Sequence, residues 1–351
     1  MILKLLRYMF GHLSYMLSNE HGFAGLRGDQ VALYRKDMYK AEREGMLEVP
    51  TMYNKITKVV SGAQVDGAGN KKTQLLGPGQ LDRHTVEGQN IRFKSPVEGW
   101  TTYVKYHTYS AGLIFSFESI QDTVKLGNMI KELAALWGRE TRIAKETLVS
   151  TAFNDGGDLL GSFVFNGSYT GETDPSGDLL YDSKPFFNLT GNARTTKGGG
   201  TYYNSVAGLT ATAGNFETVY NLATATNNRD EEDRVAANPV DTVLTKPGAD
   251  HFAFNRILLS EHLAGGQLND KNPYVGLIKN IWAWDYLDES AFYVGKAQHP
   301  SIEFHERMAP LMDFFRNNEN AGYMASNLNR FGIWFKDGAW RAWTRGGGSS
   351  A

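Results

Sequence analysis

The sequence predicts a mixed α+β protein, and three observations lead to this prediction. A long pattern with helical spacing runs from residue 119 to about 152, alternating apolar segments lie on both sides of it, and glycine is frequent. The 351 residues are 41% apolar, which is enough for a sizeable core, and include 38 glycines. At roughly 150 residues per domain, this length indicates about two folded units.

The composition argues against several classes of protein. The 36 basic and 38 acidic residues give a net charge of −2, whereas a dedicated nucleic-acid binder has a basic surplus. The absence of cysteine excludes a disulfide framework, a thiolate zinc site, an iron–sulfur centre and a cysteine nucleophile. No stretch approaches the ~18 uncharged residues of a membrane span.

The N-terminal segment has the spacing of an amphipathic helix. Lys4 and Arg7 interrupt its apolar run, which argues against a signal peptide, and its polar face lacks the basic cluster of a membrane-surface helix. Two interpretations stay open: a helix packed on its own domain and a helix docked on a neighbouring subunit. The apolar stripe comprises Ile2, Leu5, Leu6, Met9, Leu13, Met16 and Leu17.

Two strand-like segments, 53–60 and 100–117, enclose a polar stretch of about forty residues. This stretch is rich in turn dipeptides such as Asp66-Gly67, and loops of this length in compact domains are usually functional or disordered. We expect an extended hairpin that leaves the body of the molecule. Its basic residues are Lys71, Lys72, Arg83, Arg92 and Lys94.

Ser119 begins the longest helical pattern, with Asp122 completing a start that resembles a capping box. About 34 residues at ~1.5 Å per residue give a rod of ~50 Å, which we call the spine helix. Gly127 and Gly138 each weaken it by roughly 1 kcal/mol relative to alanine, so a bend at either is plausible. Glu146 is expected among the charges on the solvent face.

The second half alternates short strands and helices. Asn215 and Asp250 are expected to cap two helices, and Asp337-Gly338 joins two aromatic runs in the pattern of a hairpin. The glycine-rich stretch 197–200 is expected to be mobile and the tail 346–351 disordered. The other expected strands are 240–245, 275–284, 290–294 and 302–307.

Residues with catalytic or metal-binding chemistry are scattered. His299 and His305 flank Glu303 with strand spacing, which favours ordinary polar residues over a zinc site. The charge run 229–234 is expected to be a solvated loop, because a calcium loop would need a glycine at its sixth position. No phosphate-binding loop or nucleophile elbow is present. The sequence therefore predicts no cofactor, no metal and no enzymatic activity.

An acidic cluster beside two tryptophans leaves one catalytic hypothesis open. These residues fit a glycosidase-like carboxylate pair with sugar-stacking rings, and they fit structural turn acids between two strands as well. The residues are Trp282, Trp284, Asp285, Asp288 and Glu289.

The order of these elements resembles the major capsid proteins of tailed bacteriophages, which have the Hong Kong 97-like fold. The resemblance covers nearly the whole chain and rests on this order together with several local stretches. These are Pro96-Val-Glu-Gly99 leading to Phe117-Glu-Ser-Ile-Gln-Asp122, Val243-Leu-Thr-Lys-Pro-Gly248 leading to Arg256-Ile-Leu258, Ile281-Trp-Ala-Trp-Asp285 leading to Ser290-Ala-Phe-Tyr-Val294, and Phe331-Gly-Ile-Trp-Phe-Lys-Asp-Gly338.

The resemblance implies a division of the chain into an arm, a loop and two domains. Residues 1–50 would be the N-terminal arm and 51–110 the extended loop that overlaps an adjacent subunit. The peripheral domain, with the spine helix, would comprise 111–154 and 295–345, and the axial domain 155–294. Arm and hairpin cannot bury enough apolar surface alone to offset roughly 1–2 kcal/mol of ordering cost per residue, so we expect both to be ordered on neighbouring subunits.

The resemblance also implies a function and partners. The chain would self-assemble into hexamers and pentamers of an icosahedral phage head in the host bacterial cytoplasm and become part of the virion. The head would enclose double-stranded DNA without sequence-specific binding and involve no membrane. Since no scaffolding segment precedes the arm, a separate scaffolding protein, or earlier processing, is implied. The other expected partners are a portal and decoration proteins. The alternatives are an encapsulin-like cellular nanocompartment shell and, more remotely, a carbohydrate-active enzyme or adhesin.

The candidate functional residues are therefore those of subunit interfaces. They come from the arm, the extended loop and the charge run. They are Leu5, Leu6, Met9, Leu13, Lys71, Lys72, Arg83, Arg92, Lys94, Arg229, Glu231 and Glu232.

Overall fold

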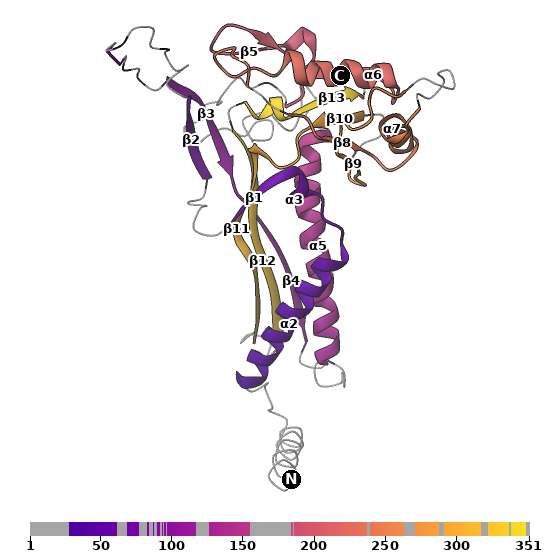
Figure 1. Cartoon of the computed structure of the whole chain (residues 1–351). Coiled ribbons are helices and arrows are strands. Elements are labelled where there is room, and N and C mark those ends of the chain that lie inside the picture. The colour runs from indigo at the N-terminus through magenta and orange to yellow at the C-terminus, as the bar shows by residue number, and fades with distance from the viewer. Residues whose placement is uncertain are drawn as a thin grey trace, which may run out of the picture. The chain divides into compact units, whose positions relative to one another are not determined.

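The computed structural model divides the chain into two compact units (Figure 1). Unit 1 comprises residues 1–49, 109–141 and 310–329, and unit 2 comprises 50–108, 142–309 and 330–351. The predicted mixture of helices and sheets is confirmed. The structure describes residues 28–61, 69–76, 83, 87, 90–91, 93, 95, 97–116, 126–154, 184, 186–236, 239–262, 271–287, 291–316, 322–336 and 338–348.

Helices and strands alternate along the described chain. The α-helices are α2 (Gly28–Glu48), α3 (Tyr53–Ile56), α5 (Leu126–Asn154), α6 (Ala213–Asn221) and α7 (Ala249–Leu259), with short turns η3 (Thr190–Asn192), η4 (Leu222–Thr226) and η5 (Ala339–Ala342). The strands are β1 (Thr57–Ser61), β2 (Gly69–Leu76), β3 (Val97–Lys105), β4 (His107–Phe115), β5 (Arg194–Thr195), β6 (Thr201–Tyr202), β7 (Ser205–Val206), β8 (Thr242–Thr245), β9 (Asn280–Ala283), β10 (Ala291–Gly295), β11 (His299–Arg316), β12 (Tyr323–Phe335) and β13 (Trp343–Gly347).

The strands that the structure describes form four sheets. The first has the order β1-β11-β12-β4 and the second the order β7-β13-β10-β8-β9. Two small sheets pair β2 with β3 and β5 with β6, both antiparallel. The expected hairpin in the polar stretch is thus present as the β2–β3 ribbon. The capping pair at Ser119 and Asp122 lies outside the described residues, and the spine helix is described from Leu126 as α5.

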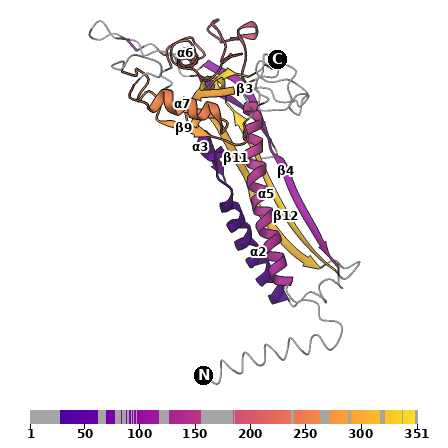
Figure 2. The ribbon, with the colours of Figure 1, turned by 90° about the vertical axis from the view of Figure 1, so that its right-hand side faces the viewer.

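Unit 1 has a layer of two helices on one face of its sheet (Figure 2). Met38 and Ala41 of α2 and Ile130, Ala134 and Trp137 of α5 pack against apolar side chains of the strands. The strands contribute Phe115, Met312, Phe314, Tyr323 and Ala325. Residues 28–48 were predicted to belong to an arm that is ordered on neighbouring subunits. This prediction is wrong for α2, which packs on its own chain.

Two glycines bring α2 and α5 into close contact. A Cβ atom added at Gly45 would lie 2.0 Å from the carbonyl oxygen of Ala135, and one added at Gly138 would lie 2.1 Å from that of Glu42. Real Cβ contacts are essentially never below 3.0 Å. Gly138 was expected to mark a bend; the structure instead assigns it the role of admitting the backbone of α2.

Unit 2 is built around its five-stranded sheet. The central strand β10 is buried at every position, and α6 and α7 contribute Phe216, Val219, Phe254 and Leu258 to the core beside it. Around Phe153 at the end of α5, five other aromatic rings lie with centroids within 6.2 Å. These rings belong to Phe186, Phe187, Trp284, Tyr293 and Trp343.

The prediction of a C-terminal hairpin at Asp337-Gly338 is wrong. Gly338 has φ of 77° and is followed by the 3-10 turn η5, so the Asp-Gly step does not join two paired strands. β12 belongs to the first sheet and β13 to the second. Gly346 and Gly347, expected in a disordered tail, pair with Phe292 and Ala291 of β10.

Several local boundaries also differ from the prediction. Thr212 caps α6 by accepting a hydrogen bond from the Asn215 N–H, so Asn215 lies within the helix. Gly248 precedes α7, and Asp250 stands in its first turn. The strand expected over 275–284 comprises only β9, and the one expected over 302–307 extends to the 18 residues of β11. The boundaries of the peripheral and axial domains stay a prediction.

Candidate functional site

The predicted interface residues do not gather at one place in the described structure. Lys71 and Lys72 lie on β2, opposite Tyr103 and Thr102 of β3, and Arg83 is exposed. Arg229, Glu231 and Glu232 lie in the loop after η4. The remaining candidates, Leu5, Leu6, Met9, Leu13, Arg92 and Lys94, lie outside the described residues, and their interface role stays a prediction.

The charge run 229–234 is an ordered loop held by its own polar groups. Asp230 accepts hydrogen bonds of 2.9 Å from the backbone N–H groups of Glu232 and Arg234, and one of 2.8 Å from Arg234 Nε. Burial alone would raise the pKa of the Asp230 carboxyl, but these hydrogen bonds lower it. Arg229 and Val235 close the loop as a β-bridge.

Glu231 turns into the protein instead of facing water. Its side chain is 3% exposed and pairs with Arg341 at 2.5 Å, and the Arg341 guanidinium lies 4.6 Å from the ring centre of Trp340. The expectation of a solvated loop is therefore wrong for this residue. Removing one member of a buried pair leaves the other charge without compensation, so this contact anchors the loop within unit 2.

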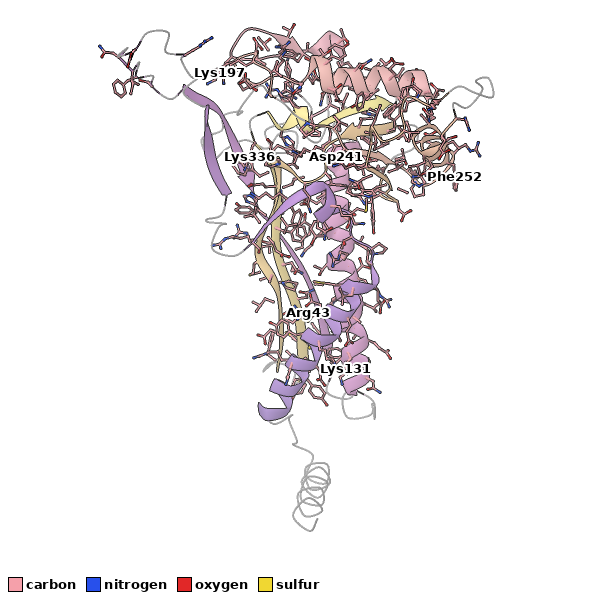
Figure 3. All side chains as sticks on the ribbon, viewed as in Figure 1. Arg43, Lys131, Lys197, Asp241, Phe252 and Lys336 are labelled. Carbon is pink, nitrogen blue, oxygen red and sulfur yellow. The ribbon has the colours of Figure 1, made fainter. Side chains whose placement is uncertain are left out.

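Asp233 holds the glycine-rich turn 197–200, which the sequence analysis expected to be mobile. It accepts hydrogen bonds from Thr196 Oγ1 at 2.6 Å and from the Gly200 N–H at 2.9 Å, near Lys197 at the edge of unit 2 (Figure 3). A Cβ at Gly198 or Gly200 would lie within 2.5 Å of the Asp233 carboxylate, which explains the need for glycine. The loop 229–235 thus interlocks with a second loop of its own chain.

Glu303 and His305, two of the three residues weighed for a zinc site, belong to a buried chain of polar contacts. His305 Nε2 lies 3.0 Å from Glu303 Oε2, and its Nδ1 lies 2.9 Å from the Tyr106 hydroxyl. Glu303 also accepts from Lys336 at 2.7 Å and from Lys58 at 3.5 Å (Figure 3 labels Lys336). Burial would raise the pKa of Glu303, but hydrogen bonds from His305 and Lys336 lower it to about 2.

Because Glu303 is ionised and can only accept, His305 Nε2 donates to it, and His305 Nδ1 lies within hydrogen-bond distance of the Tyr106 hydroxyl. Tyr106 lies between the end of β3 and the start of β4. Its contact with His305 therefore attaches the base of the β2–β3 ribbon to β11. His299 does not belong to this chain of polar contacts. Burial and the nearby charges of Lys296, Arg341 and Lys336 lower its pKa to about 4.

Within the tryptophan cluster, Trp284 has a structural role. Trp284 is buried and donates from Nε1 to Glu146 Oε2 at 3.0 Å. Glu146 additionally accepts from the backbone N–H groups of Met52 at 2.8 Å and Tyr53 at 3.2 Å. Burial raises its pKa. Glu146, expected on the solvent face of the spine, is instead fully buried; Asp288 and Glu289 lie outside the described residues.

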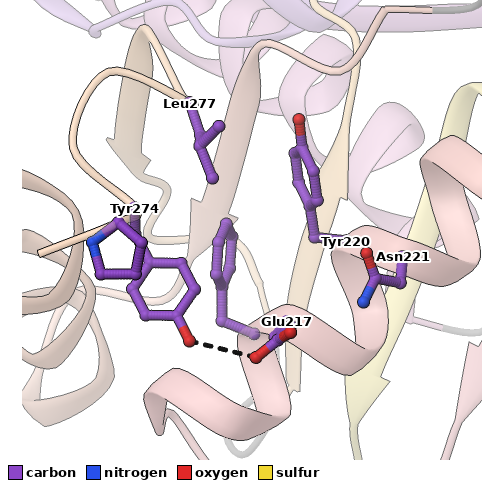
Figure 4. Close-up of a pocket in the computed structure, with 7 residues that line it drawn as sticks. Glu217, Tyr220, Asn221, Tyr274 and Leu277 are labelled. Carbon is purple, nitrogen blue, oxygen red and sulfur yellow. Dashed lines mark hydrogen bonds between the residues drawn. The ribbon is translucent and has the colours of Figure 1, made fainter.

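A shallow pocket of about 270 Å³ opens between α6 and the turn 273–277 (Figure 4). Phe216, Tyr220 and Leu277 are among its lining residues, and Glu217 is the one carboxylate among them. The Tyr274 hydroxyl donates to Glu217 Oε2 at 3.1 Å. The pocket therefore lacks the pair of acidic groups that glycoside hydrolysis uses.

Within the described ranges, no group of three or more His, Asp or Glu side chains could hold a metal ion. The helices that the structure describes include none long and apolar enough to cross a membrane. The polar side chains reported above are used to fix loops and strands of the same unit.

Comparisons with known proteins give structural similarities only. No family model matches the sequence, and no curated protein matches it. The chain is similar to a virus-like particle protein from Pyrococcus furiosus, with 10% identity, a TM-score of 0.47, and coverage of 89% of this chain and 98% of that one. For the mature capsid of bacteriophage PhiM1, the identity is 9%, the TM-score is 0.48, and the match covers 85% of this chain and 87% of that one. For the capsid of cyanophage P-SCSP1u, the identity is 10%, the TM-score is 0.45, and the match covers 86% of this chain and 89% of that one.

Proposed function

We propose that this chain is the structural subunit of an icosahedral phage head that assembles from many copies of itself. The observation that supports the proposal is the order of elements: the β2–β3 ribbon, the 29-residue helix α5, the unit 2 sheet with α6 and α7, and the long strands β11 and β12. This is the order that the resemblance to tailed-phage major capsid proteins implies. The proposal gives the chain the role named in the descriptions of the similar capsids.

The ribbon adds a physical argument for assembly. Among the described strands, β2 and β3 pair only with each other. An isolated two-stranded ribbon is marginally stable in water, and its outer edges present unpaired backbone groups. A neighbouring subunit that covers the ribbon would supply the missing contacts, as heterologous contacts in a closed ring do.

The proposal extends to the partners of such a head. A scaffolding protein, a portal and decoration proteins would assist assembly in the host cytoplasm, and the finished shell would hold double-stranded DNA by enclosure. The net charge of −2 is compatible with an inner wall that does not bind the genome tightly.

Electron microscopy of particles purified from infected or expressing cells tests the proposal. We expect closed shells, and from infected cells nuclease-protected DNA of uniform genome length. Shells that contain a protein cargo and no DNA would favour a cellular nanocompartment. A chain that stays monomeric would contradict both.

A further inference from the structure

In the described part of the chain, α2 and α5 pack on one face of the sheet of unit 1, and the opposite face carries exposed apolar side chains. Met312 and Phe314 of β11 point into the core beneath α2 and α5, as do Tyr323 and Ala325 of β12. Side chains alternate between the two faces of a strand, so residues 311, 313 and 315 and residues 324, 326 and 328 lie on the opposite face. On β4, Phe115 faces the core and Ile114 therefore faces away.

The opposite face carries apolar side chains on three neighbouring strands, with Asp313 and Ser326 between them along β11 and β12. Ile114 is 64% exposed, Leu311 50% and Phe315 42%, with the half-buried Met324 and Leu328 on β12, which lies between β11 and β4. We call these five residues the outer patch. Single exposed apolar residues are ordinary, but a group of them on adjacent strands indicates a binding surface.

We propose that the outer patch is the docking surface for residues 2–17 of the same chain. This segment lies outside the described residues, and its sequence carries the stripe that includes Leu5, Leu6, Met9 and Leu13. Between Leu5 and Leu13 a helix rises about 12 Å, and β11 extends about 13 Å between Leu311 and Phe315. The lengths of the two apolar surfaces therefore match.

The position of α2 makes the chain's own segment the occupant. Near the start of α2, the Tyr34 ring lies 6.0 Å from the Phe314 ring, so this end of the helix lies beside the C-terminal end of β11. Only residues 18–27 connect the stripe to α2, and ten residues span at most about 33–36 Å. A short tether gives an effective concentration in the millimolar range, which favours the patch of the same chain over that of a neighbour.

The inference does not depend on the proposed shell function. It assigns to the N-terminal segment the first of the two interpretations that its sequence left open, and it continues the behaviour of α2, which covers the other face of the same sheet.

Cysteine cross-linking tests the inference directly, because the natural chain has no cysteine. The test variant carries Met9→Cys with Leu311→Cys. The control carries Met9→Cys with Leu136→Cys, since Leu136 on α5 is exposed to a similar extent, 46%. Both full-length proteins are prepared as mixtures of ¹⁴N- and ¹⁵N-labelled chains, treated with a short bismaleimide and analysed by mass spectrometry of linked peptides.

We expect the test pair to link several-fold more than the control, with both peptides from chains of one isotope. Mixed-isotope links would assign the patch to a neighbouring chain and overturn the inference, and equal yields in both variants would overturn it as well. A second measurement uses single cysteines. Deletion of residues 1–17 should raise the thiol reactivity of Leu311→Cys several-fold and leave that of Leu136→Cys unchanged; no change at Leu311→Cys would also refute docking.

Discussion

Replacing Gly138 by alanine should destabilise the protein, although the position lies inside a long helix. Helix propensity alone predicts that Gly→Ala stabilises by about 1 kcal/mol. The structure opposes this, because the new Cβ would lie 2.1 Å from the Glu42 carbonyl oxygen and 2.9 Å from the Met46 nitrogen. Both obstacles are backbone atoms, so a side-chain rotation cannot relieve the overlap and the two helices must separate by nearly 1 Å.

The size of the effect follows from two opposing contributions. Overpacking of a well-packed contact costs typically about 1–3 kcal/mol, and a gap of 0.5–1 Å forfeits a quarter to a half of each dispersion contact along the seam. Met38, Ala41, Ala134 and Trp137 line this seam and would lose contact with one another. After the gain in helix propensity, we expect a net loss of about 1–3 kcal/mol in the free energy of unfolding.

Urea denaturation of the variant and the wild type measures this loss. The matched control is Gly214→Ala in α6, where a Cβ meets nothing within 4 Å, and which should leave stability unchanged or raise it by up to about 1 kcal/mol. A Gly138→Ala protein as stable as the wild type or more stable would refute the argument that the two helices touch through their backbones.

Four further predictions concern the buried polar groups of unit 2. Glu146→Ala leaves three buried donors without their acceptor and should cost about 3 kcal/mol or more in urea denaturation, with Glu146→Gln costing less because it keeps one acceptor oxygen. Arg341→Met should cost about 3–5 kcal/mol, and adding Glu231→Leu should restore part of it; a double-mutant cycle without coupling would contradict the buried pair. Stability should fall from pH 6.5 to 4 as the unfolded chain protonates His299, whose folded pKa is about 4, and His299→Asn should flatten this part of the curve of stability against pH. From about pH 4.5 to 2 it should fall further, because the folded pKa of Glu303 is about 2, and Glu303→Gln should remove that part.

The sequence predicted elements whose pattern is local. The spacing of Ile130, Leu133 and Trp137 indicates a long helix, and alternation indicates most of the strands, because both patterns depend only on backbone period. The prediction of a hairpin from the two C-terminal aromatic runs failed, because there tertiary packing outweighs the local pattern. Their Asp-Gly link has the composition of a hairpin turn, but burial of each run in a different sheet outweighs the preference of the turn. The sequence did not predict α2, because its apolar residues are few and its close contact with α5 depends on Gly45, which has no side chain.

The polar contacts were least predictable. Glu146 has the helical position of a surface charge, and only its partners more than ninety residues away, Met52 and Trp284, make it a buried acceptor. Glu231 is likewise one of four consecutive acidic residues, and nothing local distinguishes the one that Arg341 binds. Such pairs depend on tertiary placement, which no spacing rule encodes.

Sedimentation velocity of the purified full-length chain tests the central claim most directly. The proposal of a shell subunit predicts a narrow, fast boundary of closed particles containing many copies, in exchange with rings of five or six chains during assembly. A single slow boundary at the mass of one chain, 39.0 kDa, at every concentration tested would contradict it.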